Sequence, residues 1–156
     1  MKSVVAVVLC LVFPLSAFAA ENGYKIGYDG GSIANAKAGT EMRLIIDGSN
    51  VRIMQAKTEV AVIPATAITE ISYGQDVHRR VGAAIGLAVF SLGLGALLAL
   101  SKSKKHFVGL TWDDGNGKKG GCAFQADKND YRGLLAGLEG ITGKKAVDSD
   151  AMTVKN

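Results

Sequence analysis

An uncharged run of twenty residues, 81–100, lies in the middle of this 156-residue chain. As an α-helix rising about 1.5 Å per residue it would be roughly 30 Å long, which matches the hydrocarbon thickness of a bilayer. We therefore expect residues 78–105 to be an apolar, membrane-associated helical insertion. The side chains expected to enter the membrane are Val81, Ile85, Leu87, Val89, Phe90, Leu92, Leu94, Leu97, Leu98 and Leu100.

Basic residues flank the run on both sides. Arg79 and Arg80 precede it, and Lys102, Lys104 and Lys105 follow it. Lysine and arginine at the ends of an apolar segment are typical of chain that meets lipid headgroups. We therefore predict that these five residues form the headgroup flanks of the insertion.

Three arrangements of the run are open. It can span the membrane once, which suits its length. It can instead form a helical hairpin that leaves by the face through which it entered, with the bend at Gly93 and Gly95. The third arrangement is an apolar hairpin buried within the fold or against a partner.

Small residues at the start of the run suggest a packing face. Gly82 and Gly86 form a GxxxG pattern, which lets helix backbones approach closely in lipid. Together with Gly93 and Gly95, these glycines are the expected helix-packing residues. The pattern predicts a homo-oligomer assembled through this stripe, whereas no feature identifies another protein partner.

The first nineteen residues are typical of a cleaved export signal. Lys2 supplies the positive start, and Ala17 and Ala19 are the small residues before a cut after Ala19. We expect the mature chain in the cell envelope, membrane-associated and facing the periplasm. Cleavage removes Cys10 and leaves Cys122 alone, so no disulfide forms within one mature chain. A formal net charge of +4 is too small to indicate a nucleic-acid partner.

Short segments of alternating apolar and polar residues surround the run and predict β-strands. The first strand is expected to stop at Asp29-Gly30-Gly31, and Asp47-Gly48-Ser49-Asn50 predicts a hairpin turn. The strands are expected at residues 24–28, 42–46, 51–54, 59–63, 68–73, 106–112 and 121–126.

One amphipathic helix is expected after the last strand. Asp127 is its predicted N-cap and Gly140 its predicted stop. Its apolar face consists of Tyr131, Leu134, Leu135 and Leu138. From there, residues 141–156 are expected to be a flexible tail.

The strands before the run and those after it are too few to make two stable cores. We therefore predict one mainly β domain that is split between residues 20–77 and 106–140. About seven strands would form a small barrel or sandwich with a C-terminal helix, interrupted by the apolar helical insertion.

This arrangement resembles bacterial pleckstrin-homology or GRAM-like domains between about Thr40 and Gly140. The resemblance is carried by Ile63-Pro64, by Ile68-Thr69-Glu70-Ile71, by the late turn at Asp113-Asp114-Gly115 and by the last helix. It implies a membrane-binding or scaffolding module with a barrel fold. The early strands lack the cluster of lysine and arginine that would transfer an inositol-phosphate site, so lipid-headgroup specificity is not implied.

Motifs that would indicate an enzyme are incomplete. His78 and His106 are the only histidines, and two histidines without a third ligand make a poor metal site. The S-x-x-K spacing at Ser101–Lys104 has no S-D-N or K-T-G companion. Residues 113–117 resemble a calcium loop, but Lys118 stands at a ligand position, so a hairpin turn is favoured.

These observations favour a non-enzymatic binding or scaffolding module without a cofactor, and its lipid partner is the membrane. Two alternatives remain from other classes. One is a small enzyme or enzyme subunit that is completed by a partner. The other is a soluble, secreted ligand-binding barrel.

Overall fold

The computed structural model describes residues 23–86 and 106–151. These residues are mainly β, as the sequence predicts. Their elements are β1 (Tyr24–Gly31), β2 (Glu41–Asp47), β3 (Asn50–Gln55), β4 (Thr58–Pro64), the 3-10 helix η1 (Ala65–Ala67), β5 (Ile68–Tyr73), α2 (Val77–Ile85), β6 (His106–Asp113), β7 (Lys119–Ala126), α4 (Tyr131–Thr142) and β8 (Val147–Asp148).

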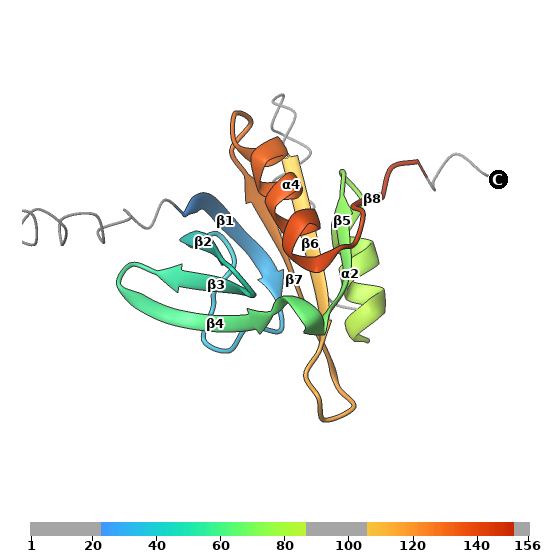
Figure 1. Ribbon diagram of the computed structural model, residues 1–156, viewed down its shortest axis with the longest axis horizontal. Coiled ribbons are helices and arrows are strands. Elements are labelled where there is room, and N and C mark those ends of the chain that lie inside the picture. Colours follow the sequence, from blue (N-terminus) through green and yellow to red (C-terminus); the bar gives the residue numbers. More distant parts are fainter. Residues whose placement is uncertain (1–22, 87–105, 152–156) are drawn as a thin grey trace, which may run out of the picture.

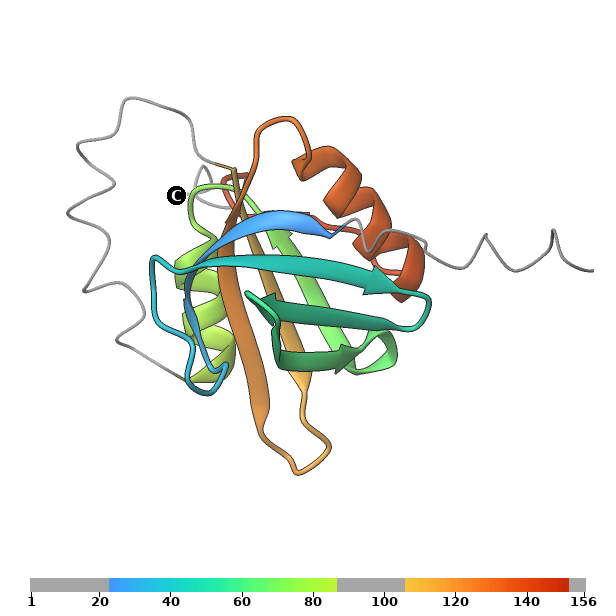
Figure 2. The same cartoon turned by 90° about the vertical axis from the view of Figure 1, so that its left-hand side faces the viewer.

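All eight described strands belong to one sheet, in the order β4-β3-β2-β1-β7-β6-β5-β8. Neighbouring strands are antiparallel, except that β8 runs parallel to β5. Strand β1 joins the two halves of the sheet, because it pairs with β2 on one side and with β7 on the other. In Figures 1 and 2, β2–β4 cross over β5–β7, so the sheet folds over on itself.

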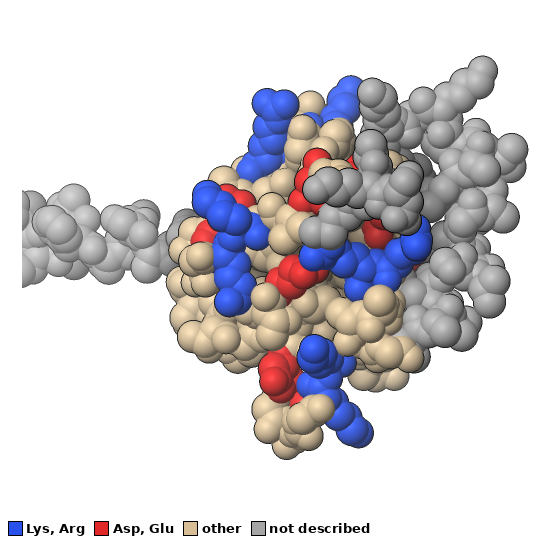
Figure 3. Space-filling model, turned by 90° about the vertical axis from the view of Figure 1, so that its right-hand side faces the viewer, with Lys and Arg blue, Asp and Glu red and all other residues tan. Residues whose placement is uncertain are grey.

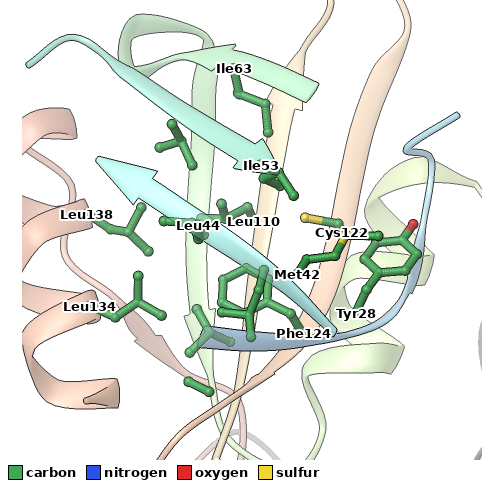
Figure 4. Packing of buried hydrophobic residues seen from close by; sticks show 14 of the residues in the cluster. Tyr28, Met42, Leu44, Ile53, Ile63, Leu110, Cys122, Phe124, Leu134 and Leu138 are labelled. Carbon is green, nitrogen blue, oxygen red and sulfur yellow. The ribbon is translucent and has the colours of Figure 1, made fainter. Parts of the chain in front are cut away.

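The core lies between the two halves of the folded sheet. Leu44 and Ile53 come from β2 and β3, and they meet Leu110 and Phe124 from β6 and β7 (Figure 4). Helix α4 packs against β2, β5 and η1, and it adds Leu134 and Leu138 to the core. All six side chains are fully buried.

Strands from both sides of residues 87–105 alternate in this sheet. Strand β7 pairs with β1, and β6 pairs with β5, although the segment separates both pairs in sequence. The two halves of the chain therefore build one core and one fold. Within the described residues, 23–86 and 106–151, no helix has the length and apolarity needed to cross a membrane.

Strand β1 does not stop at the Asp29-Gly30-Gly31 sequence, so that prediction is wrong. The register against β7 shifts between Tyr28 and Gly30, and pairing then resumes up to Gly31. A β-bulge of this kind inserts one residue and bends the strand without ending it. The glycines tolerate the bend, and Asp29 becomes the inserted residue.

The C-terminal region also differs from the prediction. The N-cap position of α4 is Asp130 instead of Asp127, without a side-chain capping hydrogen bond. The helix runs past Gly140 to Thr142, and its C-cap, Gly143, has a left-handed conformation. The expected flexible tail is wrong for residues 144–151. There β8 pairs with β5, and the backbone N–H of Ser149 donates a 2.7 Å hydrogen bond to the carbonyl of Tyr73.

Candidate functional site

Helix α2 covers the outer face of the sheet, opposite the core, over β6 and β7 (Figure 2). Val77 and Val81 are fully buried against Phe107 and Ala123, and Ile85 packs partly against the same cluster. These helix residues are four apart and therefore lie on one face. As a result β6 and β7 are buried on both faces, which explains their nearly continuous apolar sequences.

Two glycines make room for this helix. A Cβ atom added at Gly109 would lie 2.6 Å from Cγ2 of Val81 and 2.7 Å from Cγ1 of Val77. A Cβ atom added at Gly121 would lie 2.8 Å from Cγ2 of Ile85. Real Cβ atoms do not approach so closely, so the close seat of α2 depends on glycine at both positions.

Two polar side-chain contacts tie α2 to the sheet. His78 Nε2 lies 2.7 Å from Asp29 Oδ2, and both side chains are largely buried. The His78 ring also meets the Phe107 ring edge-on, with 4.7 Å between their centroids. Arg80 donates two hydrogen bonds to Glu70, of 2.5 and 2.9 Å. The bulge in β1 therefore has a structural use, because it brings Asp29 to the helix.

The segment after α4 makes hydrogen bonds with the residues that lead into α2. Oδ1 of Asp150 accepts the backbone N–H of Gln75 at 2.6 Å and that of Asp76 at 3.2 Å. Ser149 is buried and its hydroxyl donates to the carbonyl of Tyr73 at 3.0 Å. Residues far apart in sequence thus fix the first turn of the helix.

The expected helix over residues 81–100 does not form as one piece. Helix α2 ends at Ile85, and Gly86 follows with a left-handed φ of 71°. Val81 and Ile85 face the sheet instead of lipid. Gly82 is buried, and Gly86 caps the helix, so the predicted GxxxG stripe does not lie along a continuing helix. The physical reason is that the sheet itself supplies the apolar surface for the first part of the run.

Two of the predicted headgroup residues are described. Arg80 is partly exposed and donates hydrogen bonds to Glu70, whereas Arg79 is exposed. The remaining predicted residues lie outside the described residues. They are Leu87, Val89, Phe90, Leu92, Gly93, Leu94, Gly95, Leu97, Leu98, Leu100, Lys102, Lys104 and Lys105.

The two described ends of the segment 87–105 lie towards opposite ends of β6. Ile85, just before Gly86, packs at Gly121, which pairs with Thr111. His106 begins β6. Thr111 is five steps along the strand from His106, which corresponds to about 17 Å. Helix α2 lies over the sheet between these two levels.

Three aromatic rings from separate elements stack at the His106 end of the sheet. Tyr73 of β5 and His106 of β6 are joined by a 3.1 Å hydrogen bond between the phenolic oxygen and Nδ1. The Tyr131 ring of α4 is nearly parallel to both, with centroid distances of 5.5 Å to Tyr73 and 3.9 Å to His106. We refer to these three residues as the tyrosine–histidine stack.

Arg132 makes the two tyrosines of the stack electrostatically different. Its Nε donates a 3.0 Å hydrogen bond to the Tyr131 oxygen, which lowers the pKa of Tyr131 below 10.0. Burial, aided by the neighbouring Tyr131 and by Asp148 and Asp150, raises the pKa of Tyr73 above the same value. The stack is therefore a polarised, hydrogen-bonded group at the surface, although it lies beside the apolar core.

Other candidate chemical groups are inert or engaged. Burial raises the pKa of the Cys122 thiol to about 12, so it is not a nucleophile. Asp113 and Asp114 accept backbone N–H groups of their own turn, as expected of a hairpin. Among the described residues, no group of three or more His, Cys, Asp and Glu side chains could hold a metal ion.

Charge is mixed over the side of the molecule that carries α2 and β8. Figure 3 shows basic and acidic side chains interspersed on the described part of this side. Such a mixture produces no strong field of one sign. Any attachment of this side to a surface would therefore depend on apolar residues more than on charge.

Comparison with known families and proteins does not assign this chain to a family. No protein-family model matches the sequence, and no curated protein matches it either.

Several of these contacts were not foreseen from the sequence. The His78–Asp29 pair joins α2 to a bulge, and the stack joins β5, β6 and α4. Neither has a local spacing that marks it. The one available signal was the position of the two histidines at the borders of the apolar run.

Proposed function

We propose that this protein is a non-enzymatic, membrane-associated binding or scaffolding module of the cell envelope. Its folded part would be a small pleckstrin-homology-like barrel, and apolar residues within 87–100 would hold it at the bilayer. The strand order, in which β1 connects the two halves of a sheet whose ends are β4 and β8, supports the barrel. The helix α4 beside β2 and β5 supports it further.

One observation carries the proposal: both flanks of the segment belong to one sheet. A single crossing between Gly86 and His106 would place β6 and β7 across the membrane from β5 and β1, their hydrogen-bonded partners. Unpaired strand edges are costly. In this proposal the segment returns to the side from which it leaves, and the shared sheet favours the hairpin over the single span.

The length that remains after α2 agrees with this choice. Fourteen residues, 87–100, stay apolar and uncharged. As one helix they would extend about 21 Å, which is shorter than the roughly 30 Å hydrocarbon core. They suit a shallow insertion better than a crossing. Because α2 lies between the two attachment levels, its face of the sheet would point towards the headgroups.

Vesicle flotation tests the attachment. Replacing Leu87 and Leu97 together with Asp should cost about 5 to 7 kcal/mol of insertion free energy. The wild-type chain should float with phosphatidylcholine vesicles, and the double variant should remain at the bottom of the gradient. Val62→Asp is the matched control, because Val62 is 48% exposed on β4 and should not affect flotation. A wild-type chain that does not float contradicts the proposal.

Cysteine labelling tests the return to one side. Ser49 and Asn116 are exposed, and they lie before and after the segment. In a Ser49→Cys or Asn116→Cys variant, the buried Cys122 should stay silent towards an impermeant thiol reagent. Both introduced thiols should be labelled from the same side of the membrane. Labelling of the two probes from opposite sides would establish a single crossing and refute the topology.

A further inference from the structure

The tyrosine–histidine stack has a chemical consequence that is independent of membrane attachment. Tyr73 and Tyr131 are the two tyrosines that stack on each other among the described residues, with rings 5.5 Å apart and 6° from parallel. His106 Nδ1 lies 3.1 Å from the phenolic oxygen of Tyr73, within hydrogen-bond distance. Both tyrosines are partly exposed.

We propose that Tyr73 and Tyr131 are a site of oxidative modification, at which a one-electron oxidant produces a dityrosine crosslink between β5 and α4. The oxidant belongs to the class of peroxidase ferryl species or peroxyl radicals. The crosslink would fix the N-terminal end of α4 to the sheet covalently.

The reaction balances without another participant. Each phenol gives one electron to the oxidant and releases one proton, so two electrons and two protons leave in total. The Tyr73 proton passes to His106 Nδ1 in the neutral ring whose own proton is on Nε2, because Nδ1 then accepts the Tyr73 hydrogen bond. Tyr131 releases its proton to solvent. The radicals then form one carbon–carbon bond ortho to the hydroxyls, and the two ring hydrogens move to the oxygens.

The contacts around each ring favour this pair over the other tyrosines. Arg132 donates a 3.0 Å hydrogen bond to the Tyr131 oxygen, which favours loss of the phenolic proton. The Tyr73 and Tyr131 rings are also nearly parallel, with their centroids 5.5 Å apart. By contrast, Tyr28 is buried in the core, where its side chain is only 2% exposed. The neighbours of Tyr24 on α4 are Gly133 and Gly137, so it does not face another tyrosine there.

The chain has four tyrosines, so the test is direct. The full chain is treated with horseradish peroxidase and hydrogen peroxide, and dityrosine fluorescence is followed. Monomer is then digested and analysed by mass spectrometry. We expect a Tyr73–Tyr131 peptide pair lighter than its parts by two hydrogen atoms. Tyr131→Phe keeps the stacked ring and should abolish this product, whereas Tyr24→Phe should leave its yield unchanged.

A second variant examines the role of the base. His106→Phe retains an aromatic ring but removes the proton acceptor, so the crosslink should form more slowly while circular dichroism shows an unchanged fold. Absence of a crosslink within wild-type monomers would overturn the proposal. So would crosslinks that involve Tyr24 or join only separate molecules, or a yield unaffected by Tyr131→Phe.

Discussion

Replacing Gly109 with Ala should loosen α2 while it leaves the core intact. The added Cβ would lie 2.6 Å from Cγ2 of Val81 and 2.7 Å from Cγ1 of Val77. It would also press against the hydroxyl of Ser72 on β5. The helix must therefore move outwards, or the valines must leave their favoured rotamers.

The expected loss of unfolding free energy is the smaller of two costs, the detachment of α2 and the overpacking of its contact with the sheet. Val77 and Val81 are fully buried, so complete detachment of α2 would lose about 3 to 6 kcal/mol at about 1.5 to 3 kcal/mol for each side chain. Overpacking by a methyl group costs about 1 to 3 kcal/mol when neighbours adjust. Adjustment is cheaper, so we expect the free energy of unfolding to fall by about 1 to 3 kcal/mol with α2 still docked.

Urea unfolding followed by the fluorescence of Trp112, the single tryptophan, measures this change. Gly27→Ala is the matched control, since Gly27 is also a strand glycine and an added Cβ would meet only Gln125, at 3.9 Å. Val81→Ala should partly relieve the effect of Gly109→Ala, giving a coupling of about 0.5 to 3 kcal/mol in a double-mutant cycle. Equal destabilisation by both glycine variants, or no coupling with Val81, would refute the seat of α2 described above.

Three further predictions concern buried and paired groups. Cys122 should not react with a thiol reagent in the folded protein but should react in urea, because its thiol is fully buried and its pKa is raised to about 12. Burial also raises the pKa of Tyr28 to about 12, so Tyr28 and Cys122 both keep their protons in the folded state. The free energy of unfolding should therefore be fully present below about pH 9 and should decrease towards pH 12. A series of urea unfolding curves over that pH range measures the decrease. Glu70→Gln should lower the free energy of unfolding by less than about 1 kcal/mol in the same urea assay, because the pair with Arg80 is partly exposed; a larger loss would mean that this pair dominates the docking of α2.

Alternation of apolar and polar residues predicted strands such as β2 and β3 well, because one face of each strand packs on the core and the other faces solvent. In β2 and β3, the residues that alternate inwards, such as Leu44 and Ile53, are buried, and their neighbours Arg43 and Arg52 are not. The Asp47-Gly48-Ser49-Asn50 turn connects them as predicted. Leu134 and Leu138 of α4 also reach the core, since spacing by four defines a helix face.

The errors arose where tertiary contacts override the local pattern. Gly30 and Gly31 predicted a strand end, but pairing with β7 continues through a bulge. Gly140 predicted a helix stop, yet the left-handed conformation occurs at Gly143. Both cases show that glycine permits a break without requiring one, and distant partners decide whether it occurs.

The apolar run itself combines two roles that hydropathy does not separate. Its beginning is apolar because β6 and β7 need a cover on their outer face, and Val81 and Ile85 provide it. Gly109 and Gly121 in those strands allow this cover, since the helix can lie close only where the strands lack side chains. The sheet thus accounts for the run as far as Gly86. Residues 87–100 continue the apolar run beyond α2, and it is this remainder that the membrane proposal concerns.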